Sequence, residues 1–299
     1  MVKMMSFKEQ LNKKIETVTE LIYEMAPEEN EEISVIIGAM NYSFKAGGKR
    51  LRPLLMYETY KMFGGTSDDL QYFMAAIEMI HTYSLIHDDL PAMDNDDYRR
   101  EKLTNHKVFG EDIAILAGDA LLNYAYELMS KAVVEGDDIS ANARAMQVIA
   151  KKAGIYGMVG GQSIDVKTEG TPIDEKTLMT IHNLKTAALI EASMMAGAII
   201  AGASKNEVDK IEQIAKNIGL AFQIQDDILD VTSSSEVLGK PVMSDEKNNK
   251  TTYITLKGLE DSKKAVKDYS DKGLEELKSF NKDSAFLEEL FKYLIYREK

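Results

Sequence analysis

Apolar residues recur at helical spacing along most of the chain. In the segment 70–89, the residues Leu70, Phe73, Met74, Ile77 and Leu85 repeat at intervals typical of one helix face. A second series of this kind precedes Val231 and consists of Ile211, Ile214, Ile218, Phe222 and Leu229. The sequence has no convincing alternation of apolar and polar residues of the kind that strands require. The pattern predicts an all-α fold with about ten or more helices of ordinary length.

Residues that interrupt helices divide this pattern into segments. Proline or glycine occurs at Pro27, Gly47-Gly48, Gly64-Gly65, Gly136, Gly170-Thr171-Pro172 and Gly239-Lys240-Pro241. Asp174 is a candidate N-cap for the helix that follows Pro172. No linker rich in proline, glycine or serine separates two halves, so we expect a single domain over residues 1–299.

Composition narrows the possible partners. The formal net charge of -13 disfavours nucleic acid and anionic lipid as partners. The chain has no cysteine, which excludes disulfides and thiolate metal sites and suits a cytoplasmic location. The most membrane-like segment, 186–203, is short for a membrane span and contains Glu191, so we interpret it as a buried core helix. We therefore expect no stable membrane insertion.

Two carboxylate clusters follow long apolar helix patterns. The first contains Asp88, Asp89 and Asp94, and the second is Asp226-Asp227-Ile228-Leu229-Asp230. On an unbroken helix, Asp88 and Asp94 would point about 240° apart, but Pro91 should end the helix near Asp89 and allow Asp94 to turn back. Asp226 and Asp230 are four residues apart and share a face. Clustered carboxylates of this kind suit Mg²⁺, whereas a single cluster would also be compatible with a solvated helix end.

Basic residues are rarer and are grouped. Gly47-Gly48-Lys49-Arg50-Leu51-Arg52-Pro53 places three cations in four residues, and Arg99-Arg100 follows the first acidic cluster. Glycine-rich backbone before a helix start, together with Lys and Arg, favours phosphate oxygens. A diphosphate substrate is therefore expected. For Arg50 we favour ordinary surface charge.

Several of these segments, in this order, resemble the trans-prenyl diphosphate synthase family. The matching pieces are Gly47–Pro53, His81–Arg100, Thr104–Glu111, Leu116–Leu122, Gly160–Gln162, Lys185-Thr186, Phe222–Asp230 and the following Leu-Gly-Lys. The six-residue step from Asp88 to Asp94 resembles the bacterial farnesyl branch. The resemblance implies an isoprenoid synthase helical bundle with a central apolar cavity, assembled as a homodimer. It implies Mg²⁺-dependent head-to-tail condensation of isopentenyl diphosphate with an allylic diphosphate.

The resemblance also implies residue roles. Asp88, Asp94 and Asp226 would coordinate Mg²⁺, as three ions with the bound diphosphate, and Asp89, Asp227 and Asp230 would support them. Isopentenyl diphosphate would contact Lys49, Arg52, His81 and Arg100. The allylic diphosphate would contact Arg99, Lys185, Lys240 and Lys250, with Thr186 and Gln223 facing the allyl group. The chain departs from the family at Glu101, where glycine is usual, and at Met243; Glu101 is expected to weaken diphosphate affinity slightly.

Product length is predicted from the helix that carries Asp88. Tyr83 lies five residues earlier, about 7.5 Å deeper at the helical rise. In the family an aromatic residue there resembles a floor that stops growth at farnesyl diphosphate, whereas Ser84 is too small to block. Tyr83 could instead be an ordinary core tyrosine. The alternatives are geranylgeranyl diphosphate as product, a terpene cyclase of the same fold, or a non-catalytic partner subunit.

Overall fold

The structure is a computed structural model that describes residues 5–232 and 251–296. Over these residues it is almost entirely helical, which confirms the predicted all-α class. Its elements are α1 (Phe7–Glu24), the short 3-10 helix Glu31–Ile33, α2 (Ser34–Phe44), α3 (Leu51–Met62), α4 (Leu70–Asp88), β1 (Tyr98–Arg99), β2 (Lys102–Leu103), α5 (Asn105–Phe109), α6 (Glu111–Glu135), α7 (Ile139–Ala153), α8 (Met158–Thr168), α9 (Glu175–Ile181), the π-helix His182–Ala187, α10 (Ala188–Ile200), α11 (Lys205–Thr232), α14 (Tyr253–Lys257), α15 (Leu259–Lys278) and α16 (Ala285–Ile295).

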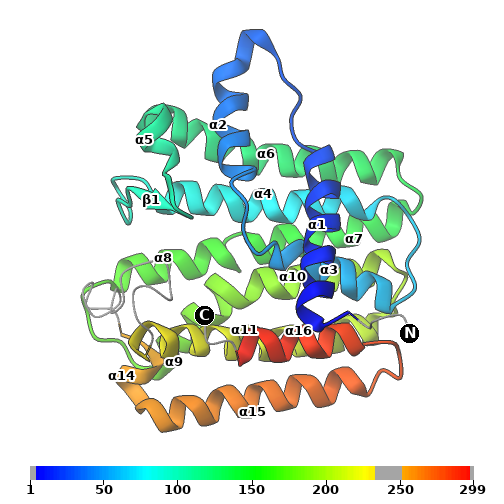
Figure 1. Ribbon diagram of the computed structural model, residues 1–299, viewed down its shortest axis with the longest axis vertical. Helices are drawn as coiled ribbons and strands as arrows, with labels where there is room; N and C mark the ends of the chain where they lie inside the picture. Colours follow the sequence, from blue (N-terminus) through cyan, green and yellow to red (C-terminus); the bar gives the residue numbers. More distant parts are fainter. Residues whose placement is uncertain (1–4, 233–250, 297–299) are drawn as a thin grey trace.

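The core lies where α4 and α10 pass through the bundle. α4 packs against α6 and α3, whereas α10 packs against α3, α7 and α11, and α15 covers the far side of α11. In Figure 1, α4 and α11 both run from the right side of the view and end on the left. The two helices that carry the aspartate clusters therefore deliver them to the same side of the molecule.

The prediction that segment 186–203 is a buried core helix is confirmed. Every residue of α10 from Ala188 to Ile199 is buried, and the carboxylate of Glu191 forms an ion pair with Lys152 of α7. Gly197 allows close packing on α3, because a Cβ there would lie 2.3 Å from the Met56 carbonyl oxygen. Within the described part of the chain, no helix is both long and apolar enough to cross a membrane.

Local signals in the sequence placed several boundaries correctly. α4 begins at Leu70 and ends at Asp88, three residues before Pro91. The Asp174 carboxylate accepts a hydrogen bond from the Thr177 amide and caps α9 as predicted. Among residues 5–232 and 251–296 there is also one short hairpin, β1–β2, with two residues in each strand, in which Arg99 pairs with Lys102. Its turn residues Arg100 and Glu101 adopt left-handed φ angles of 52° and 63°.

Candidate active site

The first aspartate cluster folds back at the end of α4. After Asp89 the chain turns, and the Asp94 amide donates a hydrogen bond of 2.9 Å to the Asp88 carbonyl. Asp94 thus returns beside Asp88, as the break at Pro91 predicted. On the other side of the turn, the buried Asp89 accepts hydrogen bonds from Arg99 Nε at 2.7 and 2.9 Å. In this structure Arg99 is therefore held against the acidic cluster.

Asp88 has the electrostatics of a cation ligand. Burial raises its pKa to about 6, and the neighbouring Asp94 and Asp89 carboxylates also raise it, while Lys185 acts in the opposite direction. The Gln162 amide donates a 2.8 Å hydrogen bond to Asp88 Oδ1. Half-buried carboxylates that repel each other are relieved by a divalent cation, and these are the hard oxygen donors that Mg²⁺ prefers. The donor set therefore fits magnesium, although residues 5–232 and 251–296 contain no preformed group of three such ligands.

The second aspartate cluster lies in the last two turns of α11. Asp227 and Asp230 are buried, and Asp226 is half-buried. Asp227 accepts hydrogen bonds from the Gln223 amide at 3.3 Å and from the Tyr253 backbone N–H at 2.9 Å. Asp227 therefore ties α11 to the start of α14.

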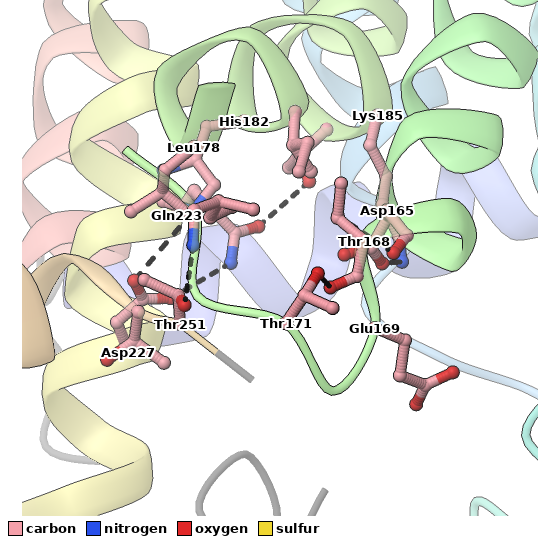
Figure 2. A pocket seen from close by; sticks show the side chains of 14 residues that line it. Asp165, Thr168, Glu169, Thr171, Leu178, His182, Lys185, Gln223, Asp227 and Thr251 are labelled. Atoms are coloured by element: carbon pink, nitrogen blue, oxygen red, sulfur yellow. Dashed lines mark hydrogen bonds and ion pairs between the residues drawn. The ribbon is translucent and has the colours of Figure 1, made fainter. Parts of the chain in front are cut away.

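The π-helix His182–Ala187 lies between the two aspartate clusters. A pocket of about 140 Å³ is lined by Asp165, Lys185, Gln223 and Asp227, and Lys185 Nζ lies 2.5 Å from Asp165 Oδ2. Figure 2 shows Lys185 pointing to Asp165 and Asp227 near Gln223. From the same π-helix, the Thr186 hydroxyl donates a 2.8 Å hydrogen bond to Gln223 Oε1. π-helices are rare and often occur at functional sites. Here the widened turn places Lys185 and Thr186 between the α4 and α11 aspartates.

An apolar cavity opens beside Asp88. Its volume is about 570 Å³, and Lys185 and Thr186 line it as well as the polar pocket. Its other lining residues are Arg52, His81, Tyr83, Ser84, Leu85, His87, Asp88, Met93, Met158, Val159, Gln162, Ser163, Val166 and Lys167. Tyr83 is only 7% exposed, and burial raises its pKa to about 12. Its ring packs edge-on against His87, with centroids 5.7 Å apart.

Arg52 and His81, which line this cavity, lie close to the charges of Arg99 and Arg100. Burial lowers the pKa of Arg52 to about 10. Burial, followed by the charges of Arg52, Arg100 and Arg99, holds the pKa of His81 well below its usual value. Arg100 donates a hydrogen bond to the Gly47 carbonyl, and a Cβ on Gly48 would lie 2.6 Å from Arg100 Cζ. The double glycine thus allows Arg100 to lie against the loop that carries Lys49.

The expectation for Arg50 was wrong. Its side chain is 1% exposed and forms a 2.6 Å ion pair with Glu78, so it is core and not surface charge. The motif Lys-Arg-Leu-Arg concealed this, because Glu78 is 28 residues away in sequence. From the sequence no role was assigned to Gln162, the last residue of the family piece Gly160–Gln162, or to Asp165, three residues further on. Lys240, Lys250 and Met243 lie outside the described residues.

The fold and the paired aspartate helices define an all-α isoprenoid synthase, and comparison with known proteins agrees. The polyprenyl synthetase family matches residues 33–294, and the chain belongs to this family. It is 47% identical over 249 residues to a farnesyl diphosphate synthase of Geobacillus stearothermophilus, which covers 83% of this chain and 84% of that protein. It is 46% identical over 270 residues to a chloroplastic geranylgeranyl pyrophosphate synthase of Capsicum annuum, covering 90% and 73%.

Solved structures share the whole architecture. An FPP/GFPP synthase from Zymomonas mobilis superimposes with a TM-score of 0.84 at 35% identity, covering 97% of this chain and 98% of that one. A geranyltransferase from Helicobacter pylori, complexed with magnesium and isoprenyl diphosphate, has a TM-score of 0.84 at 29% identity and covers 99% and 98%. The chain is therefore a prenyltransferase that acts on isoprenoid diphosphates.

Proposed function

We propose that this enzyme is a magnesium-dependent farnesyl diphosphate synthase that condenses isopentenyl diphosphate with dimethylallyl or geranyl diphosphate. The observation that carries this proposal is the apolar cavity beside Asp88, whose lining includes the cations Arg52 and Lys185 and the buried Tyr83. A hydrocarbon tail fits an apolar cavity, whereas a diphosphate requires charged groups such as these.

The diphosphate of the allylic substrate would lie between the two aspartate clusters. Magnesium held by Asp88, Asp94 and Asp226, with support from Asp89 and Asp230, would neutralise the charge that grows on the leaving diphosphate. Lys185 would orient that group, and Arg99 would exchange its contact with Asp89 for the same purpose. Lys240 and Lys250 are assigned to this diphosphate from the family resemblance. The Thr186–Gln223 pair would border the carbon that loses it.

The second diphosphate would lie against Lys49, Arg52, His81 and Arg100. The C–O bond of the allylic substrate breaks to give an allylic cation and diphosphate, and the alkene of isopentenyl diphosphate attacks this cation. The condensed cation then loses a proton to the released diphosphate. The apolar walls exclude water, which would otherwise quench the cation. Tyr83 would limit the length of the chain, with Ser84 too small to do so.

We also infer that the enzyme works as a homodimer in the cytoplasm, as a single domain, without nucleic acid or membrane partners. Support for a dimer comes from α6, where the apolar Ile115 and Leu116 are 40% and 54% exposed. Such residues are typical of a protein interface when they cluster. Sedimentation at several protein concentrations tests the subunit count.

The activity is tested by incubating the purified protein with Mg²⁺, dimethylallyl diphosphate and isopentenyl diphosphate, and identifying the products by mass spectrometry. We expect farnesyl diphosphate as the main product. Geranylgeranyl diphosphate as the main product would refute the assigned length but not the reaction. Cyclic hydrocarbons would indicate a terpene cyclase, and the absence of any product would favour a non-catalytic subunit.

A further inference from the structure

The buried ion pair Arg50–Glu78 lies near Arg52 and Arg100, two of the cations assigned to isopentenyl diphosphate. Arg50 Nη1 is 2.6 Å from Glu78 Oε1, while Nη2 donates to the Tyr23 hydroxyl at 2.7 Å and to the Phe44 carbonyl at 2.9 Å. Arg50 and Glu78 are each 2% exposed. The guanidinium therefore joins α1, the end of α2 and α4 at one buried point.

The backbone at Arg50 is held in an unfavourable conformation. Its φ angle is 45°, in the left-handed region that residues with a Cβ rarely adopt. Arg50 is the N-cap residue of α3, and its carbonyl accepts the hydrogen bond from the Leu54 amide at 3.0 Å. This sharp turn separates Lys49 from Arg52. The side chain of Arg50 is thus anchored at three points, while its backbone forms the turn between Lys49 and Arg52.

Glu78 connects this turn to the other residues assigned to isopentenyl diphosphate, namely His81 and Arg100. It lies three residues before His81 on α4, so the two side chains share a face of the helix. Its negative charge also favours the charged forms of Arg52 and Arg100, raising the pKa of each against the effect of burial. The Glu78 carboxylate thus pairs with Arg50 and also stabilises the charges of Arg52 and Arg100.

We propose that Arg50 is a positioning residue: anchored to Glu78, Tyr23 and the Phe44 carbonyl, it holds the turn 47–52 so that Lys49 and Arg52 can bind one diphosphate. This inference rests on the proposed function and concerns the isopentenyl diphosphate side of the site. The groups assigned to the allylic side are the aspartates at the ends of α4 and α11, Arg99 and Lys185, whereas Arg50 contacts α4 at Glu78, ten residues before Asp88. The two substrates should therefore respond differently when Arg50 is altered.

The test measures kcat and KM for each substrate separately in Arg50→Lys and Tyr23→Phe. Lysine keeps the charge, but one ammonium cannot reproduce the planar fork that reaches three partners. For Arg50→Lys we expect the KM for isopentenyl diphosphate to rise roughly tenfold or more, because small misplacements of binding groups are costly. The KM for dimethylallyl diphosphate should stay within about twofold. Tyr23→Phe removes one hydrogen bond and should raise the same KM by roughly threefold.

Glu58→Gln is the matched control. Glu58 lies on α3, the helix that Arg50 caps, and is also buried in an ion pair, 2.6 Å from Lys14, but it lies six residues beyond Arg52. We expect this variant to lower the melting temperature and leave both KM values unchanged. If Glu58→Gln shifts the KM for isopentenyl diphosphate as much as Tyr23→Phe does, general loosening of α3 explains the effect and the positioning role is rejected.

The remaining outcomes are also decisive. A folded Arg50→Lys enzyme with an unchanged KM for isopentenyl diphosphate overturns the inference. If Arg50→Lys does not fold, Tyr23→Phe decides alone: a selective rise supports the role, and no rise rejects it. If the unaltered protein makes no prenyl product, the proposed function itself has failed, which is a different result from an active enzyme that tolerates Arg50→Lys.

Discussion

Gly161→Ala tests how closely α8 must approach the π-helix. A Cβ on residue 161 would lie 2.3 Å from the Lys185 amide nitrogen and 2.8 Å from the Leu184 carbonyl carbon. Ordinary contact begins at 3.4 Å, so α8 and the π-helix must separate by about 1.1 Å, the difference between 3.4 and 2.3. The obstacle is backbone, which cannot rotate away as a side chain would.

That separation acts on two active-site contacts together. Gln162, the next residue, donates the 2.8 Å hydrogen bond to Asp88, and Asp165 on the same helix holds Lys185 at 2.5 Å. Overpacking of this kind costs about 1–3 kcal/mol of folding free energy. A displacement of about 1 Å in positioning groups can lower the rate on the order of 100-fold. We therefore expect a folded, moderately destabilised enzyme with kcat reduced by roughly 30- to 100-fold.

Urea unfolding measures the loss of stability, and steady-state product formation measures kcat. Gly38→Ala is the matched control, because Gly38 also lies within a helix but a Cβ there would meet only Phe109, at 4.0 Å. In this control alanine should raise stability by up to about 1 kcal/mol through helix propensity and leave kcat unchanged. If Gly161→Ala keeps kcat within about twofold and loses no stability, the tight packing of α8 on the π-helix has no functional importance.

Three further changes give distinct results. Asp88→Ala removes a metal ligand, so kcat should fall on the order of 1,000-fold. The Mg²⁺ concentration needed for half-maximal activity should rise. Near-normal turnover would refute the assignment of Asp88 as a metal ligand. Tyr83→Ala should shift the product distribution, measured by mass spectrometry, toward chains longer than farnesyl. Tyr83→Phe keeps the ring and should leave the distribution unchanged. Equal distributions in the two variants would show that the aromatic ring does not limit product length. Glu101→Gly should raise the free energy of unfolding by about 1 kcal/mol, because Glu101 has a φ of 63° in the hairpin turn. Urea titration measures this free energy. An unchanged or lower value would argue against backbone strain at Glu101.

The family's glycine preference at position 101 has a physical basis in the hairpin. In the sequence, Glu101 stands out only as a departure from the family pattern beside two arginines. In the structure, Arg99 and Lys102 are paired across a two-residue turn, which requires left-handed backbone at both Arg100 and Glu101. Glycine adopts this conformation without a Cβ penalty, whereas glutamate does so at a cost.

Much of the fold was predictable because its signals are local. The helical spacing of apolar residues, the break at Pro91 and the Asp174 cap depend on neighbours a few residues away, and each was located correctly. The identity and order of the aspartate and Gly-Gly-Lys-Arg motifs likewise indicate the family, because they can be read directly along the chain. Their roles in binding metal and substrate stay predictions until the variants are measured.

Contacts between distant segments could not be read in the same way. Arg50 has the sequence context of an exposed cation, but α4 supplies Glu78 and removes it from water. The regular pattern around Lys185 gave no warning of the π-helix, against which α8 packs closely at Gly161. Whether a charged side chain is buried or exposed depends on the partners that the packed bundle brings to it. Those partners lie tens of residues away along the chain, as Glu78 does from Arg50.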